Sequence, residues 1–223
     1  MNATIAPEPV VLRFAGRPLP NPLRGLATVC VADGAEDCEV LDGVFERYRR
    51  VVVVGSDPDL ARVLTRLLRV DRLDIEVGYA PRRRTRATRC YRLAGGWRAA
   101  RRARRGTAHR VPLIRDDAGT ALVGEGRWLP VDGADALRGE GIVDDTVLFD
   151  GEASAVRIEP LPVAPGLRAG IESARGRVRR WVRGRAAQLG TTGALVVRDR
   201  IWGTRTVKRS TFYRHIDDWL LVR

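Results

Sequence analysis

The chain has 223 residues and a hydrophobic share of 44%, which is enough for one large or two small packed domains and excludes wholesale disorder. Its three cysteines lack CxxC spacing, so neither a disulfide framework nor a zinc site is expected, and a reduced, cytoplasmic protein is the simplest interpretation. The formal net charge of +13 favours an anionic partner, while no apolar run approaches the roughly 20 residues that a membrane span needs.

The first strong pattern along the chain predicts a strand–turn–helix–strand unit. Residues 51–54 (VVVV) are apolar on both faces, as expected of a central parallel strand. The turn Gly55–Asp57 follows, with Asp57 placed as a helix N-cap, and residues 60–68 then carry leucines and valines at helical spacing. Residues 74–79 (DIEVGY) predict the next strand. This order is typical of an α/β sheet.

A basic segment begins at the end of this unit. Thirteen arginines and no acidic residue lie between Glu76 and Asp116, so the segment alone accounts for the whole net charge. It should bind phosphate in a nucleotide, a lipid head group or nucleic acid. Because Lys208 is the only lysine, a compositional preference for arginine on a solvated face is the alternative. The candidate phosphate-binding side chains are Arg82, Arg83, Arg84, Arg101, Arg102, Arg104 and Arg105.

The second half of the chain predicts mainly antiparallel strands. Residues 97–105 (WRAARRARR) predict a short helix, after which the pattern changes. Short apolar runs at 111–114, 121–124, 147–149, 156–158, 194–197, 204–207 and 219–222 are separated by turn signals. A second Arg-rich stretch, residues 170–185, is compatible with another helix.

Two turns are candidates for chemistry. Gly55, Ser56 and Asp57 follow a buried strand and precede a helix, where phosphates bind in open α/β sheets, although an ordinary capped βα turn has the same pattern. Asp150 and Glu152 flank a glycine and could hold Mg²⁺ or act as a base, but Asp-Gly is also the commonest kind of hairpin turn, and taken alone the pattern favours that structural role. Neither histidine is paired with a serine or cysteine in a way that suggests a triad.

The order of these elements resembles the catalytic fold of diacylglycerol kinases and related lipid kinases, which NAD kinases share. In that family the turn reads Gly-Gly-Asp-Gly-Thr. Here Gly55 and Asp57 match, while Ser56, Pro58 and Asp59 replace the second glycine, the third glycine and the threonine. The family's next motif is a proline followed by Gly-Thr-x-Asn, of which only Pro81 is kept. Its later Asp-Gly-Glu is matched by residues 150–152, or in degraded form by residues 197–200 (VRDR).

The resemblance implies ATP and Mg²⁺ as cofactors, Asp57 as a ligand of the metal–nucleotide complex, and Asp150 or Glu152 as the catalytic base. The departures oppose this chemistry. Pro58 removes a backbone N–H from the turn, and Asp59 adds a negative charge that could cost on the order of 1–3 kcal/mol against a triphosphate. Weak ATP binding is expected, and both an active kinase and a scaffold without catalysis stay open.

We therefore expect a two-lobed protein, with an α/β lobe at residues 1–82 that contains a parallel-type sheet and a β-rich lobe at residues 83–223. The C-terminal segment could return to the first lobe. The expected function is that of a diacylglycerol-kinase-like, cytoplasmic or peripheral membrane protein that acts at anionic lipid. The alternative is a non-enzymatic basic module for nucleic acid or an acidic protein partner. The sequence does not predict an oligomeric state.

Overall fold

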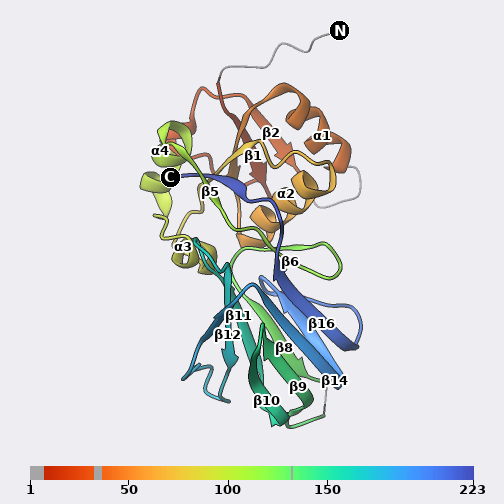
Figure 1. Ribbon diagram of the computed structural model, residues 1–223. Coiled ribbons are helices and arrows are strands. Elements are labelled where there is room, and N and C mark those ends of the chain that lie inside the picture. Colours follow the sequence, from red (N-terminus) through yellow and green to blue (C-terminus); the bar gives the residue numbers. More distant parts are fainter. Residues whose placement is uncertain (1–7, 33–36, 132) are drawn as a thin grey trace. The chain divides into compact units, whose positions relative to one another are not determined.

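The computed structural model describes residues 8–32, 37–131 and 133–223, and these form two compact units. The first unit comprises the chain up to Val111 together with Asp217–Arg223, and the second comprises Pro112–Ile216 (Figure 1). The sequence placed the boundary near residue 82, but the basic segment after that point stays in the first unit as far as Val111. It does so because α4 (Gly96–Arg105) packs on the sheet of this unit and β5 (Ala108–Val111) pairs with its C-terminal strand.

The first unit is built on a six-stranded sheet with the order β2-β1-β3-β4-β17-β5. The strands besides β5 are β1 (Val10–Phe14), β2 (Thr28–Val31), β3 (Arg50–Val54), β4 (Glu76–Tyr79) and β17 (Trp219–Val222). Neighbours are parallel throughout, except that β5 runs antiparallel to β17. The expected α/β class of this unit is confirmed.

Strand β3 lies in the middle of this sheet, between β1 and β4, and Val51–Val54 are all buried. Val52 and Val54 pack with Ala100 and Ala103 of α4. Since side chains alternate along a strand, Val51 and Val53 face the other side of the sheet, and they are buried there too. Two covered faces explain the uninterrupted valine run and confirm that this is a central strand.

The helices are η1 (Asn21–Leu23), α1 (Asp37–Arg47), α2 (Asp57–Arg69), α3 (Arg86–Cys90) and α4. Helix α2 buries one apolar stripe that includes Leu60, Val63 and Leu64, as its spacing predicts. Helix α4 approaches β4 closely because both contact residues are small: a Cβ atom on Gly78 would lie 2.7 Å from that of Ala103. No helix in the part of the chain that the structure describes is long and apolar enough to cross a bilayer.

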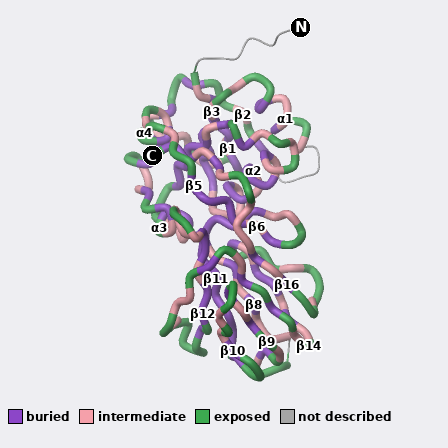
Figure 2. Tube along the Cα trace, in the orientation of Figure 1, coloured by how far each residue is buried: buried purple, intermediate pink, exposed green. Residues whose placement is uncertain are grey.

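The second unit is an eleven-stranded, predominantly antiparallel sheet whose long path runs β13-β12-β11-β8-β14-β16-β6-β7, while β9 pairs with β14 and β10 pairs with β9. Its strands are β6 (Ile114–Asp116), β7 (Ala121–Leu122), β8 (Gly126–Pro130), β9 (Leu137–Val143), β10 (Thr146–Ala153), β11 (Val156–Pro160), β12 (Leu167–Ile171), β13 (Val182–Gly184), β14 (Ala186–Arg198), β15 (Ile201–Trp202) and β16 (Val207–Arg214). Trp128 and Phe212 pack in its core, which appears as the purple stretches of these strands in Figure 2. The β-rich second lobe is confirmed.

One sequence expectation for this unit is wrong. Residues 170–185 contain no helix: β12 ends at Ile171, Glu172 and Val178 form an antiparallel bridge, and β13 begins at Val182. Gly176 takes a left-handed conformation (φ 72°) at the tip of this hairpin. Regularly spaced arginines resemble a helical face in sequence, but here pairing along the sheet edge decides the structure.

Candidate functional site

The turn between β3 and α2 is folded around its own carboxylate. Both the backbone N–H and the Oγ hydroxyl of Ser56 donate hydrogen bonds of 2.6 Å to Oδ2 of Asp59. A Cβ atom on Gly55 would lie 2.7 Å from the same oxygen, so the carboxylate sits directly over the glycine. Arg17 reaches Oδ2 from the β1 side at 3.9 Å. An anion is thus already present where a phosphate would approach this turn.

Asp57 is the first residue of α2 and follows the N-cap Ser56, so its expected place at the N-cap is wrong. Its carboxylate is held by structural partners. The hydroxyl of Tyr79, at the end of β4, donates to its Oδ1 at 2.8 Å, and the backbone N–H of Ala87, in α3, donates to its Oδ2 at 3.2 Å. Burial, followed by the nearby Asp57 carboxylate, raises the pKa of Tyr79 well above its ordinary value and keeps the phenol a donor. Asp57 therefore links α2, β4 and α3. Within residues 8–32, 37–131 and 133–223, no three His, Cys, Asp or Glu side chains are grouped so that they could share a metal ion.

A pocket of about 450 Å³ opens beside this turn. It lies where β1, β3 and β4 end, which is the edge at which ligands bind in open α/β sheets. Its lining comes from Arg17, Pro18, Leu19, Pro20, Asn21, Val54, Gly55, Ala80, Arg82, Gly96 and Trp97. The segments after β4 and before α4 meet here, since the N–H of Gly96 donates to the carbonyl of Pro81 at 2.8 Å. Arg17 and Arg82 make the pocket basic, and the buried Nε of Arg17 has no hydrogen-bond acceptor among the described residues.

The turn itself does not fit the triphosphate of ATP. The Asp59 carboxylate already accepts the N–H of Ser56, and Pro58 offers no N–H. A phosphate placed in the turn would meet a carboxylate inside its first layer of contacts, and like charges at such distances repel. The pocket beside the turn, in contrast, suits an anionic group.

The predicted arginines divide into three groups. Arg82, Arg83 and Arg84 are exposed after β4, and of these Arg82 lines the pocket. The outer face of α4 carries Trp97, Arg98, Arg101, Arg102 and Arg105, all exposed. Arg104 instead points inward and donates to the carbonyl of Pro22 at 2.9 Å, which ties α4 to η1.

Asp150 and Glu152 lie on β10 in the second unit, and both are exposed. Asp150 is opposite Glu140 of β9, and Glu152 forms an exposed ion pair with Arg138 at 3.0 Å. The expectation that the two carboxylates occupy a tight hairpin turn is wrong, because Gly151 pairs with Gly139 within the β9–β10 ladder. Both groups are open to solvent, and their role as a base stays a prediction.

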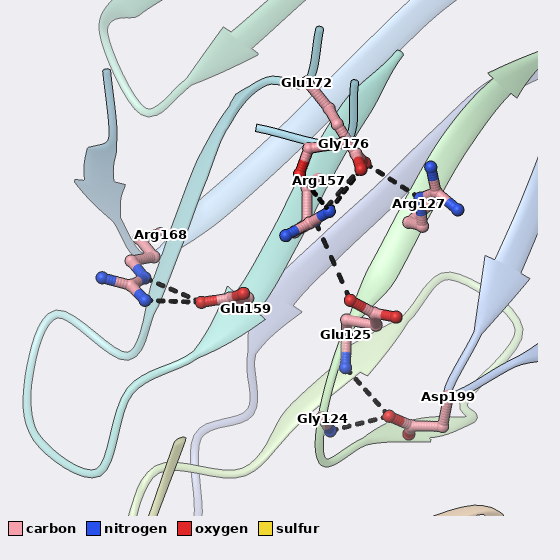
Figure 3. Close-up of polar contacts among 9 residues, drawn as sticks. All are labelled: Gly124, Glu125, Arg127, Arg157, Glu159, Arg168, Glu172, Gly176 and Asp199. Carbon is pink, nitrogen blue, oxygen red and sulfur yellow. Dashed lines mark hydrogen bonds and ion pairs between the residues drawn. The ribbon is translucent and has the colours of Figure 1, made fainter. Parts of the chain in front are cut away.

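Asp199, in the alternative match to the family's late motif, is placed quite differently. It follows β14 at a tight turn with φ of 48° and is buried. Its carboxylate accepts backbone N–H groups from Val123 at 3.0 Å, Gly124 at 2.7 Å and Glu125 at 3.0 Å; Figure 3 shows the last two. Like Asp59, this carboxylate fills a cradle of donors that would otherwise suit an external anion.

A buried ionic network lies next to Asp199 in the second unit (Figure 3). Arg157 donates to both carboxylate oxygens of Glu172 and to the carbonyl of Gly176, and its Nε lies 3.8 Å from Glu125. Arg127 donates to Glu172 Oε2 at 2.9 Å. The network connects β8, β11 and the hairpin after β12. Every group in it has a charged partner, so its evident role is structural.

Sequence reasoning missed Arg17, Asn21 and Trp97 as pocket residues. Arg17 and Asn21 belong to a proline-rich stretch without periodicity, so nothing placed them at the end of β1. The role of Asp59 had a signal, because an acidic residue three positions after a serine is a typical capping pattern.

Comparison with known proteins shows which solved structures share this fold. No family model matches the chain, and no curated protein matches it in sequence. Among solved structures, a diacylglycerol kinase from Bacillus anthracis superposes with a TM-score of 0.69 at 12% identity, covering 96% of each chain. An NAD kinase from Archaeoglobus fulgidus, solved in complex with ATP, has a TM-score of 0.63 at 12% identity, covering 96% of this chain and 93% of that one.

Yeast NADH kinase, solved with NADH, has a TM-score of 0.59 at 7% identity over 96% of this chain and 83% of its own. At such identities the likeness concerns the fold alone. The chain therefore has the two-domain fold that diacylglycerol kinases and NAD kinases share.

Proposed function

We propose that this protein is a diacylglycerol-kinase-like, peripheral protein that works at anionic lipid surfaces and does not bind the triphosphate of ATP in its β3–α2 turn. The observation that carries the proposal is the outer face of α4. Trp97, Arg98, Arg101, Arg102 and Arg105 follow helical spacing and are all exposed, while Ala99, Ala100 and Ala103 bury the opposite face.

The α4 face is suited to a membrane surface because its charge is uncompensated. None of its four arginines forms an ion pair with any described residue, and no acidic residue lies between Glu76 and Asp116. Trp97 is 56% exposed, and the guanidinium of Arg101 lies 5.8 Å from its ring centroid. Exposed tryptophan beside arginine is typical of side chains that settle at lipid head groups.

The basic pocket continues this surface, because Trp97 belongs to both. A phosphate-bearing head group drawn to the α4 face would thus find Arg17 and Arg82 next to it. Each basic residue near an anionic surface contributes about 1 kcal/mol, so four contribute about 4 kcal/mol, or about a thousandfold in partitioning at low salt. Salt should weaken the binding.

The test is retention on sedimenting vesicles. Vesicles that contain phosphatidylserine or phosphatidic acid should retain the protein, and phosphatidylcholine vesicles should not. The variant Arg98→Gln/Arg101→Gln/Arg102→Gln/Arg105→Gln should lose most of the retention. Arg104 is left intact because it holds the carbonyl of Pro22. A matched variant in the second unit, Arg183→Gln/Arg205→Gln/Lys208→Gln/Arg209→Gln, removes the same charge from exposed positions and should bind as the unmodified protein does.

Equal losses in the two variants, or retention by neutral vesicles, would contradict the proposal. Displacement from vesicles by a small excess of double-stranded DNA would favour the nucleic-acid alternative instead. Titration calorimetry with Mg-ATP tests the second part of the proposal, and a dissociation constant in the low micromolar range would show that Asp59 does not block the turn.

A further inference from the structure

A second pocket, of about 400 Å³, lies wholly within the second unit. Its apolar lining is formed by Val147 and Leu148 of β10, Ile171 of β12 and Val182 of β13. Val147 is 53% exposed and Ile171 is 38% exposed, so the pocket leaves large apolar side chains open to water. The volume lies in the range of pockets that bind small molecules.

Three arginines border this apolar hollow: Arg177, Arg179 and Arg180. All three are exposed, and none forms an ion pair with any residue in the described part of the chain. They differ in this from Arg127, Arg157 and Arg168 of the same unit, which all bind carboxylates. Three unpaired guanidinium groups at one rim would attract an anionic group, with phosphate favoured by its capacity for bidentate hydrogen bonds.

The segment that carries these arginines is fixed at both ends. At its start, Glu172 is buried against Arg157, and the Oγ of Ser154 donates to the carbonyl of Glu172 at 2.6 Å. At its end, the guanidinium of Arg168 lies 4.3 Å from the ring centroid of Trp181 and is itself held by Glu159. The pocket rim is therefore preorganised, which lowers the entropic cost of binding.

The middle of the segment, at Val178 and Arg180, also packs closely against β12. A Cβ atom on Gly170 would collide with the carbonyl of Arg180 and lie 2.6 Å from Val178. Only a glycine in β12 lets the arginine-bearing segment lie this close. The three arginines thus extend from a fixed backbone beside the apolar lining.

We propose that this pocket binds a single-chain amphiphile with a phosphate head group. The alkyl chain lies against Val147, Leu148, Ile171 and Val182, and the head group is bound by Arg177, Arg179 and Arg180. The proposal does not depend on the α4 face, which belongs to the first unit. The ligand needs both an apolar and a charged part because apolar side chains and arginines line the same pocket.

Calorimetric titration of the full chain with decyl phosphate, below its micellar concentration, tests the proposal. Inorganic phosphate supplies the head group alone, and decanol supplies the chain alone. We expect one saturable site for decyl phosphate that is at least about tenfold tighter than either partial ligand, which corresponds to about 1.4 kcal/mol. Inorganic phosphate or decanol binding as tightly as decyl phosphate would overturn the proposal, as would an absence of saturation.

Variants locate the site. Arg177→Gln/Arg179→Gln/Arg180→Gln should weaken decyl phosphate binding about tenfold or more. Val147→Asn, an exposed change that spares the fold, should bring the affinity toward that of inorganic phosphate. The matched variant Arg205→Gln/Lys208→Gln/Arg209→Gln removes the same charge elsewhere in this unit and should leave binding unchanged. Equal weakening in this matched variant would show diffuse attraction and overturn the site.

The four-arginine variant of α4 separates the two proposals. It should lose vesicle retention and keep decyl phosphate binding. If it loses both together, the pocket in the second unit is not the binding site.

Discussion

The first unit keeps its charges at the surface, whereas the second unit buries several of them. Among the described residues of the first unit, the buried polar side chains are Thr65 and Thr88, both neutral. The second unit buries Asp116, Arg157, Glu159, Glu172 and Asp199. The buried carboxylates among them all accept hydrogen bonds from arginines or from backbone N–H groups.

This difference shows that arginine has two distinct roles in one chain. The second unit pairs Arg127, Arg157, Arg168 and Arg198 with carboxylates, and the first unit pairs Arg50, Arg66 and Arg72 in the same way. The four exposed arginines of the α4 face, in contrast, have no carboxylate partner among the described residues.

The largest expected effect comes from forcing a charge into the unit that buries none. Val52→Asp and Val53→Asp should each unfold the protein, because an unpaired buried carboxylate costs several kcal/mol and domains are stable by about 5–15 kcal/mol. Urea denaturation measures both, with Ile216→Asp as control because that side chain is 86% exposed. A mild effect of either valine change would mean that one face of β3 is open to water.

A somewhat smaller effect is expected when a buried charge in the second unit loses its partner. Glu172→Ala leaves Arg157 buried without a carboxylate acceptor at that position and should cost about 3–5 kcal/mol in urea denaturation. Glu140→Ala, at an exposed position, should cost little. Replacing both partners by Glu172→Leu/Arg157→Met should recover much of the loss. A double variant as unstable as Glu172→Ala would show that the network holds the hairpin by more than charge pairing.

Asp199 and Asp150 offer a matched pair of carboxylates. Asp199→Ala leaves three backbone N–H donors without their acceptor and should cost about 1–3 kcal/mol. Asp150→Ala should change the stability by less than about 0.5 kcal/mol because Asp150 is exposed. Thermal or urea denaturation measures the free energy of unfolding of the two variants. Equal stabilities would contradict the structural role that we assign to Asp199.

The smallest effect concerns the Tyr79–Asp57 hydrogen bond of the first unit. Because the pKa of Tyr79 is raised on folding, the unfolded chain loses this proton first, near pH 10. The stabilisation is complete below about pH 10 and declines as the pH rises further. Tyr79→Phe should cost about 1 kcal/mol at neutral pH and remove this decline. Urea midpoints from pH 8 to 11.5 give the comparison, and parallel curves for the two proteins would contradict it.

The sequence predicted the features that depend on local pattern. Four consecutive valines indicated a strand covered on both faces, and residues 97–105 indicated the helix that the structure has as α4. Such predictions succeed because periodicity acts within a few residues. That the turn after β3 repels a triphosphate stays a prediction.

The rest depends on contacts between distant segments. Residues 111–114 were expected to form one strand, but Pro112 lies between β5 of the first unit and β6 of the second. The hairpin at 172–182 is determined by Arg157 and Gly170, which lie outside it in β11 and β12. The residue pattern within either segment does not indicate these contacts with distant residues.

The position of β17 has a consequence for how the protein is made. This strand lies between β4 and β5, and Trp219 packs fully buried against Tyr91. Its residues leave the ribosome only after the entire second unit has been synthesised. Until then β4 and β5 lack the neighbour that joins them, and two strand edges stay open to pairing with other chains. Of the two units, the one that contains β1 is therefore completed after the other.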